Sequence, residues 1–213
     1  MKKISLLLIV IIGSLTIQAQ SNFKIGLNAG INYPSVYGFD NAKYHNFKAG
    51  FLIGASFDYY LSEKLSLKTN INYEQKTQEY RITFFSYYGG TESSNQDFNR
   101  KIGLINIPIL LKYEFWNSNF FMNAGPFINF VISDKTDSEY LEYGNGPAPE
   151  SNKIDTGISA GIGANIALSD KHTITIEIRD DFGLINTSSV PEYYDASLKT
   201  NMIKLIVGWN LGI

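Results

Sequence analysis

Few side chains of this sequence could carry out acid–base or nucleophilic chemistry. The chain contains two histidines, His45 and His172, and no cysteine. A catalytic histidine needs a nucleophile or a carboxylate within hydrogen-bond reach, and the acids that could serve His45 are Asp97, Glu139 and Asp181. No spacing in the sequence aligns any of them with His45, and His172 stands beside a short turn. We therefore predict no catalytic residue.

Acidic residues gather in one polar stretch, at Asp134, Asp137, Glu139 and Glu142. Carboxylates bind divalent cations, but this spacing matches no calcium-binding loop, and a solvated acidic loop is the favoured interpretation. The absence of cysteine excludes disulfides, thiolate zinc sites and a lipidated N-terminal cysteine. We expect no metal and no cofactor. With 18 Lys and Arg against 20 Asp and Glu, the chain is not basic enough to indicate nucleic acid as a partner.

The first twenty residues differ from the rest of the chain. Two lysines after Met1 precede an apolar run from Ile4 to Ile17, and Ala19 supplies a small residue for a signal peptidase. The run is too short for a spanning helix, which needs roughly 20 apolar residues. The sequence predicts a cleaved signal peptide over 1–20 and an exported domain over 21–213.

The exported part alternates between apolar and polar residues with a period of two. From Phe23 to Tyr33 every odd position is apolar and every even one is polar or Gly. Successive side chains of a strand point to opposite faces, so this pattern indicates strands with one apolar face. The alternating runs lie at 23–33, 49–61, 65–73, 105–115, 120–130, 158–168, 174–178 and 203–213. We predict an all-β fold of eight antiparallel strands.

The connections between these runs alternate in length. Short turns are expected at 62–64, 116–119 and 169–171, and long polar connections at 34–47, 83–99, 133–153 and 186–199. Transmembrane barrels have this arrangement, with tight periplasmic turns and longer outer loops. The prediction is therefore an eight-stranded up-and-down transmembrane β-barrel with both termini in the periplasm.

The polar face of the predicted strands carries both charged residues and glycines. A soluble barrel turns its apolar side chains inward, whereas a membrane barrel turns them towards lipid, and periodicity alone does not distinguish the two. The charges on the second face are Lys24, Lys48, Asp58, Lys68, Glu74, Lys76, Lys112, Glu114, Glu177, Arg179 and Lys204. A solvated surface accounts for these charges equally well. It accounts less well for the glycines among them, Gly26, Gly30, Gly50, Gly54, Gly157, Gly161 and Gly163, which suit a tight lumen.

Aromatic residues favour the membrane barrel. Those next to the short turns or the C-terminus are Tyr59, Tyr113, Phe115, Trp116, Phe120 and Trp209, and those near the long connections are Tyr33, Phe47 and Phe130. Two aromatic girdles about 25 Å apart are typical of outer-membrane barrels. The segment Phe23-Lys-Ile-Gly-Leu-Asn-Ala-Gly, with Ile105 to Tyr113, Asn123 to Phe127 and Arg179 to Asn186, resembles the PorT-like outer-membrane β-barrel family over the whole mature chain. The resemblance implies this fold and location, and its namesake is similar to an accessory factor of a secretion system.

Three functions from different classes follow. The first is a non-enzymatic structural or interaction barrel with a closed polar lumen, and the second is a lipid-modifying barrel enzyme. The third is a soluble periplasmic binding barrel. For the first, the expected partners are outer-membrane lipid, the barrel assembly machinery and a protein bound by the long connections.

Overall fold

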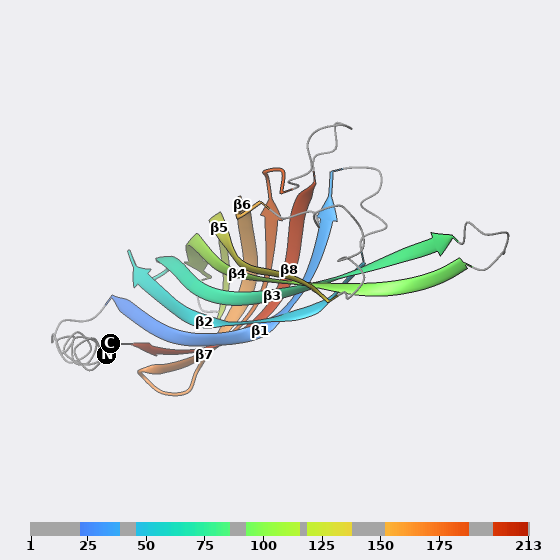
Figure 1. Cartoon of the computed structure of the whole chain (residues 1–213). Helices are drawn as coiled ribbons and strands as arrows, with labels where there is room; N and C mark the ends of the chain where they lie inside the picture. Colours follow the sequence, from blue (N-terminus) through green and yellow to red (C-terminus); the bar gives the residue numbers. More distant parts are fainter. Residues whose placement is uncertain are drawn as a thin grey trace, which may run out of the picture.

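Eight strands close into one barrel. The computed structural model describes residues 22–38, 46–85, 93–115, 119–137, 152–187 and 198–212. The strands are β1 (Phe23–Tyr37), β2 (Asn46–Tyr60), β3 (Leu65–Phe85), β4 (Ser93–Glu114), β5 (Phe120–Asp137), β6 (Ile154–Ala167), β7 (His172–Gly183) and β8 (Lys199–Gly212). Consecutive strands pair antiparallel, and β1 also pairs with β8 (Figure 1). The predicted fold class is confirmed. Residues 1–20, where the signal peptide is expected, lie outside the described ranges.

The apolar face of each strand is the outer face of the barrel. On β8, Lys204 and Ile206 are buried, whereas Leu205 and Val207 between them are 41% and 49% exposed. The same alternation runs along β7. Because the polar side chains point inward and the apolar ones outward, the wall has the arrangement of a membrane barrel. Within the described ranges, no helix is long and apolar enough to cross a membrane.

The strands run further than the alternation predicted. The expected long connection 83–99 is mostly strand, because β3 and β4 pair from Phe85 and Ser93 downwards. Figure 1 shows this hairpin extending beyond the other strands. The long connections are 38–45, 86–92, 138–153 and 184–198. The first three predicted connections were therefore too wide, and the fourth was predicted to begin two residues too late and to end one residue too late. Polar composition identified these stretches as loops, but a hairpin outside the bilayer keeps its backbone hydrogen bonds while both faces meet water.

A bulge in β2 reverses two of the predicted orientations. Lys48 lies opposite Thr77 and Phe51 opposite Gln75, so β2 carries one extra residue between these pairs. An extra residue moves the following side chains to the other face. Lys48 therefore lies on the outer face with a 53% exposed side chain, and its assignment to the lumen was wrong. Phe47 lies opposite Gln78, on the lumen side, and is not part of an outer girdle.

The other described members of the girdles have the expected exposure. At the end with the short turns, Tyr113 and Phe115 are 42% and 41% exposed, and their rings meet edge to face with centroids 5.8 Å apart. Trp209 is 43% exposed at the same end. At the opposite end, Tyr33 and Phe130 are exposed. Trp116 lies outside the described residues.

Candidate functional site

The lumen of the barrel is lined by charged side chains. Of the predicted lumen charges, Asp58, Lys68, Glu74, Lys76, Lys112, Glu177, Arg179 and Lys204 are buried, and Lys24 and Glu114 are half-buried. The structure adds three that the alternation did not assign to the lumen, Arg100, Asp155 and Asp181. Arg100 and Asp155 were missed because they come just after the stretches 83–99 and 133–153, which were interpreted as loops, and before the alternating runs at 105–115 and 158–168. Asp181 was considered only as a partner of His45.

A first cluster lies at the end with the short turns. The Lys112 ammonium is 3.2 Å from a carboxylate oxygen of Asp58 and 2.9 Å from one of Glu114. The Tyr60 hydroxyl donates a hydrogen bond of 3.0 Å to Glu114. The same ammonium lies 4.6 Å from the ring centroid of Phe121, a cation–π contact. The ammonium also lies 6.0 Å from the ring centroid of Tyr60. One cation at this end of the lumen therefore contacts two acids and two aromatic rings.

A second cluster centres on Glu177, halfway along β7. Its carboxylate accepts hydrogen bonds from Lys68 at 2.6 Å, from Nε of Arg179 at 2.7 Å and from Asn123 at 2.9 Å. Arg179 also donates to Asn70 at 3.2 Å. The donors to Glu177 come from β3, β5 and β7, so the cluster ties the opposite walls of the barrel together.

A third cluster lies towards the long connections and centres on Lys204. Its ammonium is 2.5 Å from a carboxylate oxygen of Glu74 and 2.6 Å from one of Asp181. Ser159 donates to the other oxygen of Asp181 at 2.6 Å, and Asn106 donates to Asp181 at 3.0 Å. Each of these charges is thus countered inside the lumen, which is the condition under which buried charges are tolerated.

Two glycines show how little room the lumen leaves. A Cβ on Gly163 would lie 2.4 Å from Cζ of Phe121, and one on Gly54 would lie 2.4 Å from Oδ1 of Asn72. Eight strands enclose an interior just wide enough for side chains. Glycine at these positions leaves space for the larger side chains of the residues paired with it on the neighbouring strands, Phe121 and Asn72.

The residues considered for catalysis or metal binding do not come together in the described part of the barrel. His172 stacks on Trp209 on the outer face, with ring centroids 5.4 Å apart. Asp181 is held by Lys204 inside the lumen. Asp134 forms an ion pair with Arg100. The structure places Asp97 on β4 and Asp137 on β5 without describing their side chains. The described residues do not include His45, Glu139 and Glu142. Among the described residues, no group of three or more His, Asp and Glu could hold a metal ion.

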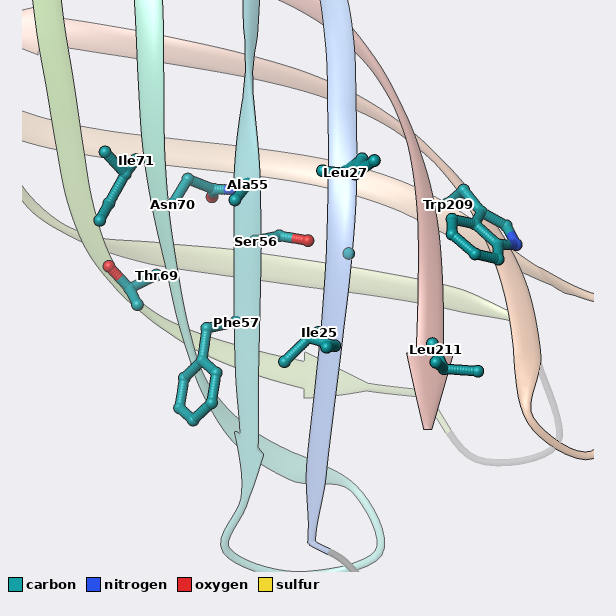
Figure 2. Close-up of a pocket in the computed structure, with 11 residues that line it drawn as sticks. Ile25, Leu27, Ala55, Ser56, Phe57, Thr69, Asn70, Ile71, Trp209 and Leu211 are labelled. Carbon is teal, nitrogen blue, oxygen red and sulfur yellow. The ribbon is translucent and has the colours of Figure 1, made fainter. Parts of the chain in front are cut away.

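The outer wall carries a shallow apolar groove over β1, β2, β3 and β8 (Figure 2). The groove forms at Ala55, whose methyl group is shorter than the side chains around it. Its apolar lining includes Ile25, Leu27, Phe57, Ile71, Trp209 and Leu211. Such a surface suits contact with hydrocarbon rather than with a polar ligand.

Comparisons with known proteins agree with this geometry. The model of the family described as "Outer membrane protein beta-barrel domain" matches residues 18–189. The crystal structure of the outer membrane protein OprG from Pseudomonas aeruginosa is similar to this one with a TM-score of 0.57 and 13% identity, over 90% of this chain and 96% of that one. Neisserial surface protein A gives a TM-score of 0.49 and 14% identity, over 91% and 98% of the two chains. No curated protein matches the sequence.

These findings decide between two of the expected locations. The family match covers most of the chain, and the apolar face is the outer one. The soluble periplasmic barrel was therefore the wrong alternative, whereas the narrower PorT-like assignment stays a prediction. The chain belongs to the outer membrane protein beta-barrel domain family and resides in the outer membrane of a Gram-negative bacterium.

Proposed function

We propose that this protein is a non-enzymatic structural or interaction barrel, whose lumen is closed and whose long connections contact a partner outside the cell. The observation that carries the proposal is the lumen itself. Its three clusters, centred on Lys112, Glu177 and Lys204, link side chains from different strands across the lumen. A lumen filled by paired charges supports the barrel and leaves the connections at its rim to contact other molecules.

The geometry of the described acids and of His172 supports a role without catalysis. His172 lies at the end with the short turns, stacked on Trp209, and so far from the outer rim, where a lipid-modifying centre would meet its substrate. Asp181, a candidate partner of His45, is bound by Lys204 and Ser159. No described contact favours the lipid-modifying alternative.

The same proposal includes the topology in the membrane. Residues 1–20 would be removed as a signal peptide, and the assembly machinery would insert residues 21–213 with both termini in the periplasm. The long connections 38–45, 86–92, 138–153 and 184–198 would then face outward. An accessory role in secretion, as the PorT-like resemblance implies, is one form that such an interaction could take.

Site-specific crosslinking in living cells tests the proposal. A photoreactive amino acid replaces Tyr88 or Tyr143, in two long connections, and Ser169, in a short turn, serves as the matched control. We expect a discrete protein adduct from a long-connection position and not from Ser169. Lipid A mass spectra of cells with and without the gene should be identical. A change in the acyl chains of lipid A, or the absence of adducts from both Tyr88 and Tyr143, would contradict the proposal.

A further inference from the structure

One carboxylate stands on the outer, lipid-facing wall of the barrel. Asp180 lies on β7 with the parity of Ile178, whose side chain is 54% exposed. Its neighbours across the strand pairs are Ala160 on β6 and Ile203 on β8. The next residue, Asp181, is buried in the lumen, so the alternation of β7 continues unbroken through both acids. The Asp180 side chain therefore points towards the bilayer.

The height of Asp180 lies within the apolar band and not at its edge. On β7, Ile174 pairs with Trp209, a member of the girdle near the short turns. With a rise of about 3.4 Å for each of about six residues and a tilt of about 40°, Asp180 lies roughly 16 Å above this pair. The apolar band is about 25 Å tall, and Phe182, further along the same face, is 43% exposed. An ionisable side chain inside the membrane is costly and marks a functional site.

The carboxylate has one polar partner among the residues that the structure describes. Nδ2 of Asn201, on β8, donates a hydrogen bond of 2.8 Å to Oδ1 of Asp180. Oδ1 of Asn201 accepts a hydrogen bond of 3.2 Å from the Ser35 hydroxyl on β1. Within the described ranges, Asp180 makes no ion pair and its Oδ2 accepts no hydrogen bond. One oxygen is thus held by the wall, and the negative charge has no counterion.

An apolar groove on the outer wall begins at Asp180 and crosses β6, β5 and β4. It forms at Ala160 and Ala124, which are paired across β6 and β5 and are shorter than the side chains around them. The row continues from Ala124 to Leu111 on β4. Neighbouring strands are about 4.8 Å apart, so the row from Asp180 to Leu111 is roughly 14 Å long. The other apolar side chains of the lining are Tyr113, Met122, Ile162 and Ile178.

A groove with a charge at one end selects an amphiphile with a cationic head and an apolar chain. In surroundings of low dielectric, an unpaired carboxylate gains most from an opposite charge in contact with it. Beyond the carboxylate, the groove offers apolar side chains, which suit hydrocarbon. Of the residues that line the other groove, at Ala55, none is charged. Only the groove at Asp180 therefore combines an apolar lining with a charge among the described residues of these two sites.

We propose that this groove binds a long-chain primary amine. The ammonium group lies against Asp180, and the hydrocarbon chain runs along Ala160 and Ala124 towards Tyr113. Asn201 holds one carboxylate oxygen and leaves the other for the ammonium group. The site stands on the outer wall and uses neither the lumen clusters nor the long connections, so it is independent of the function proposed above.

Photolabelling in lipid vesicles tests this inference. The folded, full-length mature protein in phosphatidylcholine vesicles is irradiated with a dodecylamine that carries a diazirine near the end of its chain, or with the corresponding alcohol. Mass spectrometry of the peptides then locates the adducts. The amine should label the far end of the groove, at Leu111, Tyr113 and Met122, about tenfold more than the alcohol does, because a hydrogen bond between charged groups contributes at least this factor.

Two variants and two matched controls complete the test. D180N removes the charge but keeps an oxygen for Asn201, and it should reduce labelling by the amine to the level of the alcohol. A160L fills the groove and should reduce this labelling as well. The controls are D170N, in a short turn, and A55L, which fills the other groove (Figure 2). Both should be labelled like wild-type protein, and heat-modifiable migration in gels verifies that every variant is folded.

Equal labelling of the groove by the amine and the alcohol would overturn the inference. So would unchanged labelling of D180N or A160L, or an equal loss in D170N or A55L. A wild-type dimer that dissociates on substitution D180N would show that a second copy of the chain covers the groove, and the inference would again be wrong. None of these results affects crosslinking from Tyr88 or Tyr143, so the two proposals fail separately.

Discussion

At the scale of single residues, the lumen depends on cations that are shared between acids. Lys112 contacts Asp58 and Glu114, Lys204 contacts Glu74 and Asp181, and Glu177 receives both Lys68 and Arg179. A buried ion pair adds little net stability, but the loss of one partner leaves the other charge buried and uncompensated. The lumen should therefore tolerate removal of a charge far less well than the turns do.

Lys68→Ala tests this expectation. The substitution removes the ammonium group 2.6 Å from Glu177, which keeps Arg179 as its remaining ion-pair partner. The loss of one charge-assisted hydrogen bond should lower the free energy of unfolding by roughly 1.5–3 kcal/mol. Lys171→Ala, in an exposed short turn, should change it by less than about 0.5 kcal/mol. Urea unfolding of the protein in lipid vesicles measures both. If the two variants unfold at the same urea concentration, the ion pair between Lys68 and the buried Glu177 carboxylate does not contribute to stability as described.

At the scale of the strand, each element has one face for lipid and one for the lumen. On β6, Ile158 and Ile162 are 52% and 63% exposed, whereas Asp155 and Ser159 are buried. The outward side chains find their apolar surroundings in the bilayer rather than in a protein core. The cost of a charge on this face should then depend on its depth along the strand.

The pair Ile162→Arg and Ile154→Arg measures that depth dependence. Ile162 lies near the middle of β6, so its replacement should cost roughly 2–4 kcal/mol, whereas Ile154 begins the strand near the interface and should cost about 0–1 kcal/mol. Urea titrations in vesicles again give the free energies. Equal costs at both positions would show that β6 does not cross the bilayer with this face towards lipid.

At the scale of the whole molecule, eight strands and large paired side chains leave the barrel narrow. Phe121, Arg179 and Lys204 are among the largest fully buried side chains. A channel along the axis would have to separate Lys204 from Glu74 or Asp181, and Glu177 from its donors.

The protein should consequently not act as a diffusion pore. In planar bilayers, we expect no steady conductance of the size seen with 16-stranded porins, because the interior of an eight-stranded barrel accommodates only side chains. Recordings of protein that shows heat-modifiable migration provide the measurement. Large and stable current steps from such protein would contradict the closed lumen.

Local pattern was sufficient to predict the number of strands and the faces of most of them. Alternation with period two is a property of adjacent residues, so Ile162, Ile176 and Leu205 could be placed outward, and Lys68, Glu177 and Lys204 inward, without any knowledge of their neighbours. The charges and glycines that share the second face indicated that this polar face lines the lumen and that the apolar face is the outer one.

The ion-pair partners in the lumen, and the positions where the alternation breaks, depended on the tertiary structure. Which acid meets Lys204 is decided by the closure and register of the barrel, which bring β3, β7 and β8 together. The bulge that turns Lys48 outward is visible only as a mismatch between two paired strands. The extension of β3 and β4 likewise needed each strand to have the other as its hydrogen-bonding partner. Sequence alone determined the local alternation, and long-range pairing decided where that alternation breaks and which charges meet.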